Sequence, residues 1–246
     1  MTFSNSVLIG NWSEERLKNE YEFKLFLRKR DRRELLLQRS RTLFSNLLSE
    51  RPLAISGTHV LYGFNVQVVA SDMAGSSKMS GKQKSGLAMS ILVMDRQVDY
   101  MQNIADGCLM TLSPITTPCC RNTFVIISAK NESARGSKMK YGHEFLLRAE
   151  NYGDPTAAPL YVRYTPSSTP APADRMPLRL SATGARLIIK NCVSDTSLCV
   201  MNQNWMQTFF GPECGVTCRD YKDIHKRFTA ENIFTLVSDV ETKTKN

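Results

Sequence analysis

The feature that most constrains this chain is a run of seven charged residues inside a segment that otherwise has the pattern of a helix. From Arg28 to Glu34 the sequence reads Arg-Lys-Arg-Asp-Arg-Arg-Glu, which is two helical turns without an apolar residue on any face. A helix packs against a protein core through an apolar face, so these turns cannot be buried in an ordinary core. They must therefore face either water or a partner.

Around this run, the sequence predicts helix between Gly10 and Leu48. Ser13, followed by Glu14 and Glu15, is typical of an N-cap and an acidic first turn. Unbroken, a helix from Ser13 to Leu48 would be about 54 Å long at about 1.5 Å per residue, too long to be covered by one small domain. The apolar stripe predicted for this helix consists of Leu17, Tyr21, Leu25, Leu36, Leu43 and Leu47.

Basic residues concentrate in the same segment. Between Lys24 and Arg41, eight basic residues stand against Asp31 and Glu34, a local net charge of +6, which is most of the formal +9 of the chain. A sequence pI near 9.3 implies an acidic partner: nucleic acid, an anionic membrane surface, or an acidic protein such as tubulin. The alternative is a solvated helix that bridges two apolar patches. The eight basic residues are Lys24, Arg28, Lys29, Arg30, Arg32, Arg33, Arg39 and Arg41.

Length and composition set limits on the rest of the chain. With 246 residues, of which 42% are hydrophobic, it is long enough for one substantial core and an arm. It has no apolar run of roughly 18 residues and no secretory signal pattern, so we expect neither a membrane span nor export. Seven irregularly spaced cysteines predict reduced thiols in the cytosol. We expect a basic helical arm over residues 1–50, a body over 51–240 and a polar tail over 241–246.

Short strands and turns dominate the sequence after the arm. Residues 62–68 alternate apolar and polar, as a half-buried strand does. Residues 72–86, rich in Ser, Gly and Lys, predict a loop, and the prolines in residues 165–177 predict a surface excursion. Residues 97–112 are ambiguous. Further strands are expected at residues 87–94, 122–128, 141–147, 160–164, 186–191, 198–201, 213–219 and 233–237.

Two short patterns recur in this strand-rich part. An aromatic-glycine pair leads into a strand at Tyr62-Gly63, Tyr141-Gly142 and Phe210-Gly211. The pattern Asn-x-Phe-x-aliphatic-aliphatic-Ser occurs at residues 122–128 and again at 232–238. The recurrence indicates a degenerate threefold repeat. We therefore predict a mainly β fold, with a β-trefoil-like body behind an N-terminal α-helical arm.

Catalytic motifs are not found. The three histidines, His59, His143 and His225, are widely spaced, and no nucleophile motif lies near them. Residues 75–83 contain a Gly-Lys pair, but the phosphate-loop pattern needs a glycine where a serine stands and a serine or threonine where Gln83 stands. We expect neither enzymatic activity nor a bound cofactor.

Metal and nucleic-acid binding are also not expected. Cys214, Val216 and Cys218 share one face of a predicted strand, where a free cysteine behaves as a small buried hydrophobe. Together with Cys192 and Cys199, their spacing misses the two-residue knuckle of common zinc sites. The basic arm favours nucleic acid on charge alone, but no helix-turn-helix, finger or stacking signature accompanies it.

Several blocks of residues together carry a family resemblance. In the arm they are Gly10-Asn11-Trp12, Phe26-Leu27, Lys29-Arg30-Asp31, Leu35 through Arg41, and Asn46-Leu47-Leu48. In the body they are Tyr62-Gly63, Gly86-Leu87, Arg121 through Phe124, Ile126 through Ser128, Tyr141-Gly142, Phe145, Leu147, Leu187 through Ile189, Asn191-Cys192, Phe210-Gly211, Glu213 and Leu236-Val237. In this order and spacing they resemble the family of cilia- and flagella-associated protein 161. The chain departs from the family pattern at residues 202–205, at Phe234, and between about Tyr164 and Ala185.

The resemblance implies a structural role. The family is one of non-enzymatic microtubule inner proteins, which lie on the luminal wall of the A-tubule of axonemal doublets. It implies a place in the cytoskeleton of a cilium or flagellum, in the A-tubule lumen of the axoneme, and a contribution to axoneme stability and motility. The implied partners are alpha and beta tubulin and neighbouring microtubule inner proteins, with no nucleic acid and no membrane. Tubulin is acidic, which agrees with the charge of the arm.

We expect the partner to be contacted by the arm. Trp12 is the candidate anchor, because a tryptophan just outside a helix cap can insert into a partner's pocket; the alternative is that it packs onto the body. The helices on either side of residues 28–34 are expected to pack on protein, with the charged middle facing the partner. A cytosolic ligand- or nucleic-acid-binding module is the runner-up function. The candidate electrostatic contacts are Arg28, Lys29, Arg30, Arg32, Arg33, Arg39 and Arg41.

Overall fold

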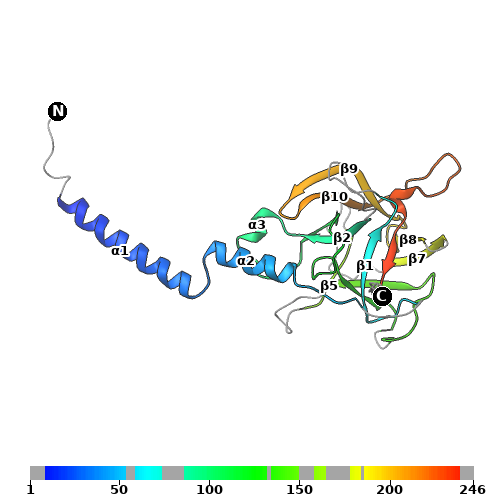
Figure 1. Ribbon diagram of the computed structural model, residues 1–246, viewed down its shortest axis with the longest axis horizontal. Coiled ribbons are helices and arrows are strands. Elements are labelled where there is room, and N and C mark those ends of the chain that lie inside the picture. Colours follow the sequence, from blue (N-terminus) through cyan, green and yellow to red (C-terminus); the bar gives the residue numbers. More distant parts are fainter. Residues whose placement is uncertain are drawn as a thin grey trace, which may run out of the picture. The chain divides into compact units, whose positions relative to one another are not determined.

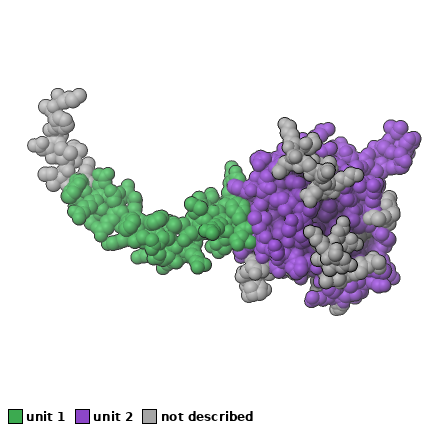
Figure 2. Space-filling view, in the orientation of Figure 1, with its two compact units in different colours: residues 1–45, 95–102 green, residues 46–94, 103–246 purple. Residues whose placement is uncertain are grey.

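The computed structural model describes residues 9–53, 59–73, 86–131, 134–149, 158–164, 178–183 and 186–238. The chain divides into two compact units, residues 1–45 with 95–102 and residues 46–94 with 103–246, which Figure 2 shows in different colours. Most of the loop expected over residues 72–86, the proline-rich excursion over 165–177 and the tail over 241–246 lie outside the described residues. The limits expected for arm, body and tail remain predictions.

The first unit is helical and contains α1 (Ile9–Asp31), most of α2 (Leu36–Leu47) and the short α3 (Asp95–Val98). Because α1 already runs from Ile9, Ser13 lies inside the helix, and the predicted N-cap at Ser13 is wrong. Gly10 and Asn11 disfavour helix by only about 0.5–1 kcal/mol each relative to alanine, too little to end one. No described helix is both long and apolar enough to cross a membrane.

The apolar stripe predicted for α2 is confirmed in part. Leu43 and Leu47 are fully buried. Leu36 is exposed, although a separation of seven residues puts it on nearly the same face as Leu43. It is the first residue of α2, at the end of the helix that adjoins the charged turn.

The second unit is a mainly β body (Figure 1). Its strands form one curled sheet in the order β8-β7-β5-β4-β1-β2-β3-β10-β9, with β6 on β5 and β11 on β1. The prediction of a mainly β chain with N-terminal helices is therefore confirmed. The strands are β1 (Asn65–Ala70), β2 (Leu87–Leu92), β3 (Leu109–Ser113), β4 (Phe124–Ser128), β5 (Glu144–Ala149), β6 (Leu160–Tyr161), β7 (Leu178–Thr183), β8 (Arg186–Asn191), β9 (Leu198–Thr208), β10 (Gly211–Cys218) and β11 (Thr235–Val237), and a 3-10 helix, η2 (Ala230–Asn232), precedes β11.

Six strands of the body pair in a ring. β1 is antiparallel to β4, β4 to β5, β5 to β7 and β7 to β8. A bridge between Leu187 of β8 and Phe234, one residue before β11, carries two backbone hydrogen bonds of 2.8 Å, and β11 pairs in turn with β1. Two hairpins, β2 with β3 and β9 with β10, extend the sheet beyond this ring. The pairing therefore leads from β1 around the body and back to β1.

The central strand of this arrangement is buried on both faces. β1 pairs with β2, β4 and β11, and Val66, Gln67 and Val68 are all inaccessible. The half-buried alternation predicted for this strand is therefore wrong, because successive side chains point to opposite faces and those of residues 66–70 are all buried. The aromatic core around it includes Phe124, Phe145 and Phe234, each fully buried.

Most of the other predicted strands are found, with shifted ends. β8 spans the predicted residues 186–191, whereas β9 runs seven residues beyond the predicted end at Met201. The ambiguous residues 97–112 contain the end of α3 and most of β3. β7, over residues 178–183, was not predicted, since it directly follows the proline-rich segment that we interpreted as an excursion.

Both recurring patterns have a structural counterpart. Gly63, Gly142 and Gly211 adopt left-handed φ angles of 83°, 78° and 101°, a conformation open to glycine, and each stands at or just before the start of β1, β5 or β10. The aromatic-glycine pair therefore marks a turn into a strand at all three places.

The two asparagines that open the longer pattern make equivalent hydrogen bonds. Each is buried, accepts one backbone N–H at 2.8 Å through Oδ1 and donates through Nδ2 to two backbone carbonyls at 2.7–3.2 Å. Each thereby fixes the loop before a strand that pairs with β1. The backbone partners are Ile115, Thr117 and Cys119 for Asn122, and Leu198, Arg219 and Tyr221 for Asn232.

Candidate functional site

The surface of α1 carries large exposed apolar side chains. Trp12 is 66% exposed, and Leu17, Tyr21, Phe23 and Phe26 are exposed as well. A helix in an ordinary globular protein buries such side chains against a core. Because these side chains are exposed to water on α1, the helix has the properties of a protein-binding surface.

These side chains form two stripes on opposite sides of the helix. Successive residues are about 100° apart around a helix axis, so Trp12, Phe23 and Phe26 fall within about 60° of one another. Leu17 and Tyr21, together with the half-buried Leu25, lie on the opposite side. The prediction of a single apolar stripe on this helix is therefore incomplete. We call the two groups the Trp12 stripe and the Tyr21 stripe.

Charged pairs fill the two seams between the stripes. Lys24 Nζ lies 2.9 Å from a carboxylate oxygen of Glu20, and Lys18 Nζ lies 3.9 Å from one of Glu22. Each pair spans four residues and is exposed, so it stabilises the helix by only about 0.3–0.5 kcal/mol. The charges separate the stripes and leave both free for apolar contact.

Trp12 lies within α1, where the sequence predicted a position just outside a cap. The guanidinium carbon of Arg16, one turn further along, lies 5.8 Å from the centre of the indole ring. This cation–π contact covers one side of the ring, while two thirds of the residue stays exposed. The side chain is therefore available as an anchor, and the anchoring itself remains a prediction.

The charged turn between the helices has a defined backbone. α1 ends in a Schellman motif, in which the Glu34 N–H donates to Lys29 O at 2.8 Å and the Arg33 N–H donates to Arg30 O at 3.1 Å. Arg33 occupies the left-handed position with φ 58°, where glycine is usual. Gln38 then joins the two helices, donating to Arg30 O at 3.1 Å and accepting the Leu35 N–H at 3.4 Å. The break between α1 and α2 is therefore a structured turn.

The predicted basic residues are brought together only in part. Arg28, Lys29, Arg32 and Arg33 are exposed around this turn, and in the described part of the chain none of them forms an ion pair. Arg30 is exposed too, but its guanidinium donates twice to Asp31, at 2.9 and 3.0 Å, which offsets its charge. Arg39 and Arg41 lie beyond the turn on α2, and Arg39 is half-buried. Trp12 is about 24 Å from Arg28 along the helix.

The most important charged pair of the body was missed by sequence reasoning. Arg121, only 2% exposed, donates to Glu213 at 2.7 Å and to Ile91 O at 3.1 Å, and its guanidinium carbon lies 3.7 Å from the centre of the Phe210 ring. Thr111 donates to the other oxygen of Glu213 at 2.7 Å. Arg121, Phe210 and Glu213 all belong to blocks that carried the family resemblance. Their shared membership of these blocks was the sequence signal that could have indicated a contact between them.

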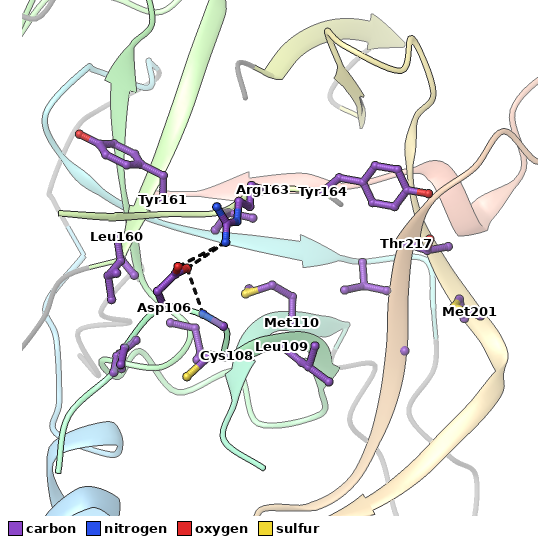
Figure 3. Close-up of a pocket in the computed structure, with 18 of the residues that line it drawn as sticks. Asp106, Cys108, Leu109, Met110, Leu160, Tyr161, Arg163, Tyr164, Met201 and Thr217 are labelled. Carbon is purple, nitrogen blue, oxygen red and sulfur yellow. Dashed lines mark hydrogen bonds and ion pairs between the residues drawn. The ribbon is translucent and has the colours of Figure 1, made fainter. Parts of the chain in front are cut away.

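The body also contains an open cavity of about 470 Å³ (Figure 3). At its edge Asp106 accepts from Arg163 at 3.2 and 3.3 Å and from the Gly107 N–H at 3.0 Å. Cys108 lies beside this pair, and burial raises the pKa of its thiol, which makes it a weak nucleophile at neutral pH. The lining is otherwise largely apolar, with Leu109, Met110, Leu160, Tyr161, Tyr164 and Met201 among its residues.

The cysteines and histidines of the described residues are placed as follows. Burial raises the pKa of Cys199 and Cys214 to about 11 and that of Cys218 to about 12, so these thiols stay protonated at neutral pH. Within the described ranges, no three His, Cys, Asp or Glu side chains lie where they could hold a metal ion. The exposed histidines are His59, His143 and His225.

Comparison with known proteins identifies the family. The model of the Cilia- and flagella-associated protein 161-like domain matches residues 39–169 and 181–239, which is most of the chain. The chain belongs to this family. The match begins within α2, so the family model leaves α1 and the charged turn outside it.

Relatives with the family name extend further. The chain is 25% identical to cilia- and flagella-associated protein 161 of Bos taurus over 266 aligned residues, covering 96% of this chain and 82% of the relative. The corresponding protein of Mus musculus is 24% identical, with 96% and 88% covered, and that of Danio rerio is 29% identical, with 60% and 49% covered. Membership places this chain among the cilia- and flagella-associated proteins.

One solved structure has a distant likeness. It is a Caenorhabditis elegans protein of unknown function from structural genomics, 9% identical, with a TM-score of 0.45 over 75% of this chain and 99% of that one. At this level the likeness carries no inference about function.

Proposed function

We propose that this chain is a structural microtubule inner protein that binds the luminal wall of the A-tubule in ciliary or flagellar doublet microtubules. In this role it contributes to axoneme stability and motility without catalysing a reaction or binding a cofactor. Its partners are alpha and beta tubulin and neighbouring microtubule inner proteins. The observation that carries the proposal is the arm of this family member: a helix with two uncovered apolar stripes, followed by an exposed cationic turn.

The two stripes favour a position between protein surfaces. A helix that docks on one flat surface needs one apolar face, and the opposite face is then polar. In α1 the Trp12 stripe and the Tyr21 stripe are both apolar and both exposed, so a single flat partner would leave one of them in water. A groove between neighbouring subunits of a polymer wall covers both stripes at once. The tubulin lattice offers such grooves.

The charged turn favours an acidic wall. Four basic residues of the turn have no carboxylate partner in the described chain: Arg28, Lys29, Arg32 and Arg33. A carboxylate on a partner protein can therefore pair with them without displacing one from this chain. Tubulin is acidic, and complementary charge contributes more to the rate and specificity of binding than to its affinity. In this arrangement the stripes provide the affinity, the turn sets the orientation, and Trp12 serves as the anchor.

For the body we propose a β-trefoil. Support comes from the ring of pairing strands β1, β4, β5, β7, β8 and β11, from the two hairpins outside the ring, and from the equivalent roles of Asn122 and Asn232. The third hairpin of a trefoil would fall between β5 and β7, where residues 150–157 and 165–177 lie outside the described residues. The body gives the arm a stable attachment.

Retention on axonemes tests the proposal. In ciliated cells that lack their own copy, a tagged wild-type chain is expected to stay with axonemes after detergent and salt extraction. Changing Arg28, Lys29, Arg32 and Arg33 to glutamine should reduce the retained fraction roughly tenfold, because the orienting charges are lost. The matched control removes the same charge from the body by changing Lys130, Arg135, Lys138 and Lys140 to glutamine, and it should leave retention unchanged.

Two results would count against the proposal. Release of the whole wild-type pool with the soluble matrix would overturn it. Salt-sensitive binding of the purified chain to RNA or DNA, without binding to microtubules, would favour the nucleic-acid-binding alternative. If the arm variant is retained as well as wild type and the body control, the cationic turn is merely solvated, and the two stripes alone hold the chain.

A further inference from the structure

The loop over residues 220–228 presents one aliphatic side chain to the outside. Ile224, at its tip, is 93% exposed, more than any other large apolar side chain in the described part of the chain. The loop projects from the body just before η2, as the orange-red segment of Figure 1 shows. A single exposed aliphatic residue is common on protein surfaces and needs no explanation by itself. What distinguishes this one is the structure that holds it in place, which we call the Ile224 loop.

Asp223 organises the Ile224 loop. Its carboxylate accepts the backbone N–H groups of His225 at 2.8 Å and Arg227 at 2.9 Å, and it pairs with the Arg227 guanidinium at 2.9 Å. Its own backbone accepts from the Lys226 N–H at 3.0 Å and donates to Arg227 O at 2.9 Å. Lys226 adopts a left-handed φ of 59°, a conformation that is unfavourable for lysine. The tip is thus fixed locally, with a strained residue, around an exposed isoleucine.

The base of the loop is fixed as well. Lys222 and Phe228 form an antiparallel bridge, and the Lys222 ammonium lies 4.9 Å from the centre of the Phe228 ring. The Tyr221 N–H donates to the buried side chain of Asn232 at 2.8 Å. A loop that is held at both tip and base loses little conformational entropy when it binds, which is the condition for an efficient contact.

The charge that the loop offers outward is positive. Asp220 and Asp223 are each engaged by a cation, Lys222 at 3.3 Å and Arg227 at 2.9 Å, and each carboxylate is less exposed than its partner. Lys226 is exposed and forms no ion pair within the described residues. The loop that carries Ile224 therefore exposes its cations more than its carboxylates. A complementary surface has an apolar pocket with acidic groups at its rim.

We infer that the Ile224 loop is a second contact surface of this chain, which inserts Ile224 into an acid-rimmed apolar pocket on a protein of the doublet wall. The choice of a doublet-wall protein as the partner rests on the proposed function. The contact itself does not involve the arm, because the loop lies outside it. A protein pocket fits better than a lipid surface, because a membrane-binding loop inserts several apolar side chains, whereas this loop presents only Ile224 at its tip and the other exposed apolar side chain, Tyr221, is 36% exposed at its base.

Substitutions at the tip test the inference in the same retention assay. Ile224→Asp should reduce the fraction retained on extracted axonemes at least about tenfold, because it places a carboxylate in an apolar pocket with an acidic rim. Ile224→Val should retain wild-type binding. Val193→Asp is the matched control, since Val193 is a second exposed aliphatic residue, 67% exposed, on a different turn of the body. Its retention should equal that of wild type.

Asp223→Ala gives an independent readout, because it leaves Ile224 in place and removes the group that organises the tip. Retention should fall, by less than for Ile224→Asp. Thermal unfolding of the purified Ile224 and Val193 variants should match wild type, and Asp223→Ala should remain folded at the temperature of the assay, which excludes misfolding as the cause of a loss. If the chain with Ile224→Asp is retained as well as wild type, the inference is overturned.

The remaining outcomes separate the two proposals. Loss of wild-type retention itself refutes the proposed function, and with it the partner named here; retained wild type with unaffected Ile224 variants refutes only the second contact. Flotation of the purified chain with phosphatidylserine-containing vesicles is the third experiment. Binding to those vesicles that is lost in Ile224→Asp, without any loss from axonemes, would identify the loop as a lipid contact and overturn the inference.

Discussion

Arginine serves opposite purposes in the two regions of this molecule. In the body, Arg121 is buried, and its guanidinium contacts Glu213, Ile91 O and the Phe210 ring. Of its three side-chain nitrogens, only Nη1 has no hydrogen-bond partner. On the arm, Arg28, Arg32 and Arg33 are exposed and have no ion-pair partner among the described residues. The body uses its buried charge to hold its own strands together. The arm leaves its charge uncommitted, which is what a binding surface requires.

The largest expected effect would come from breaking the buried pair. Glu213→Ala leaves Arg121 buried without its counter-charge, and we expect it to lower the free energy of unfolding by about 3–5 kcal/mol. Urea unfolding followed by circular dichroism measures the change. The paired substitution Arg121→Met with Glu213→Leu should recover most of the loss, since it removes both charges. A loss below about 1 kcal/mol for Glu213→Ala would contradict the role assigned to the pair.

A smaller loss is expected from the two equivalent asparagines. Asn122→Ala and Asn232→Ala each leave three backbone groups without their side-chain partner, at an expected loss of about 1–3 kcal/mol of unfolding free energy. Similar losses for the two variants would support the internal repeat. A loss confined to one of them would mean that the shared sequence pattern has no shared structural role. The same urea unfolding experiment measures both.

On the arm, substitutions are expected to weaken binding and to leave the stability of the fold nearly unchanged. Phe23→Asp and Tyr21→Asp each place a charge in one of the two apolar stripes of α1. Both should change the unfolding free energy by less than about 0.5 kcal/mol, because both side chains are exposed, and both should lower retention on axonemes. Retention that depends on only one of them would show that α1 binds a single surface. In that case a single partner surface would be enough to bind α1, and a groove between two surfaces would not be required.

A small gain in stability is expected at the turn that ends α1. Arg33 has a left-handed backbone, which is unfavourable by about 1–2 kcal/mol for a residue other than glycine. Arg33→Gly should therefore stabilise the turn, with a net gain of about 0.5–1 kcal/mol after the greater entropy of glycine in the unfolded chain. Slower hydrogen exchange of the Glu34 and Arg33 amides would report it. Faster exchange would show that the arginine side chain itself supports the turn.

The comparison of regions also explains what could be predicted from the sequence. The strands of the body were found because apolar runs bounded by turn residues are local signals, and β8 was predicted with its observed limits. β7 was missed because the prolines before it suggested an irregular segment. β1 was found, but its burial on both faces comes from tertiary packing, which the local alternation of residues does not reveal.

On the arm, local signals gave the helix and the charged break but not their details. The cap predicted at Ser13 failed because no strong breaker precedes it, so α1 extends back to Ile9. The four-residue spacing of Leu17, Tyr21 and Leu25 predicts only one apolar face, and Trp12, Phe23 and Phe26 do not share that spacing. Arg121 and Glu213 are 92 residues apart in the chain, and nothing local to either marks it as half of a buried pair.

If the chain binds as proposed, the two stripes of α1 also affect it before it reaches its partner. If a copy of the chain or a chaperone covered one stripe, the other would stay in water on the opposite side of the helix. A newly made chain therefore displays large aromatic side chains until it is installed, and exposed apolar segments of this kind are what cellular quality control recognises and removes. Surplus chain is expected to be short-lived, so that its abundance follows the amount of structure available to receive it.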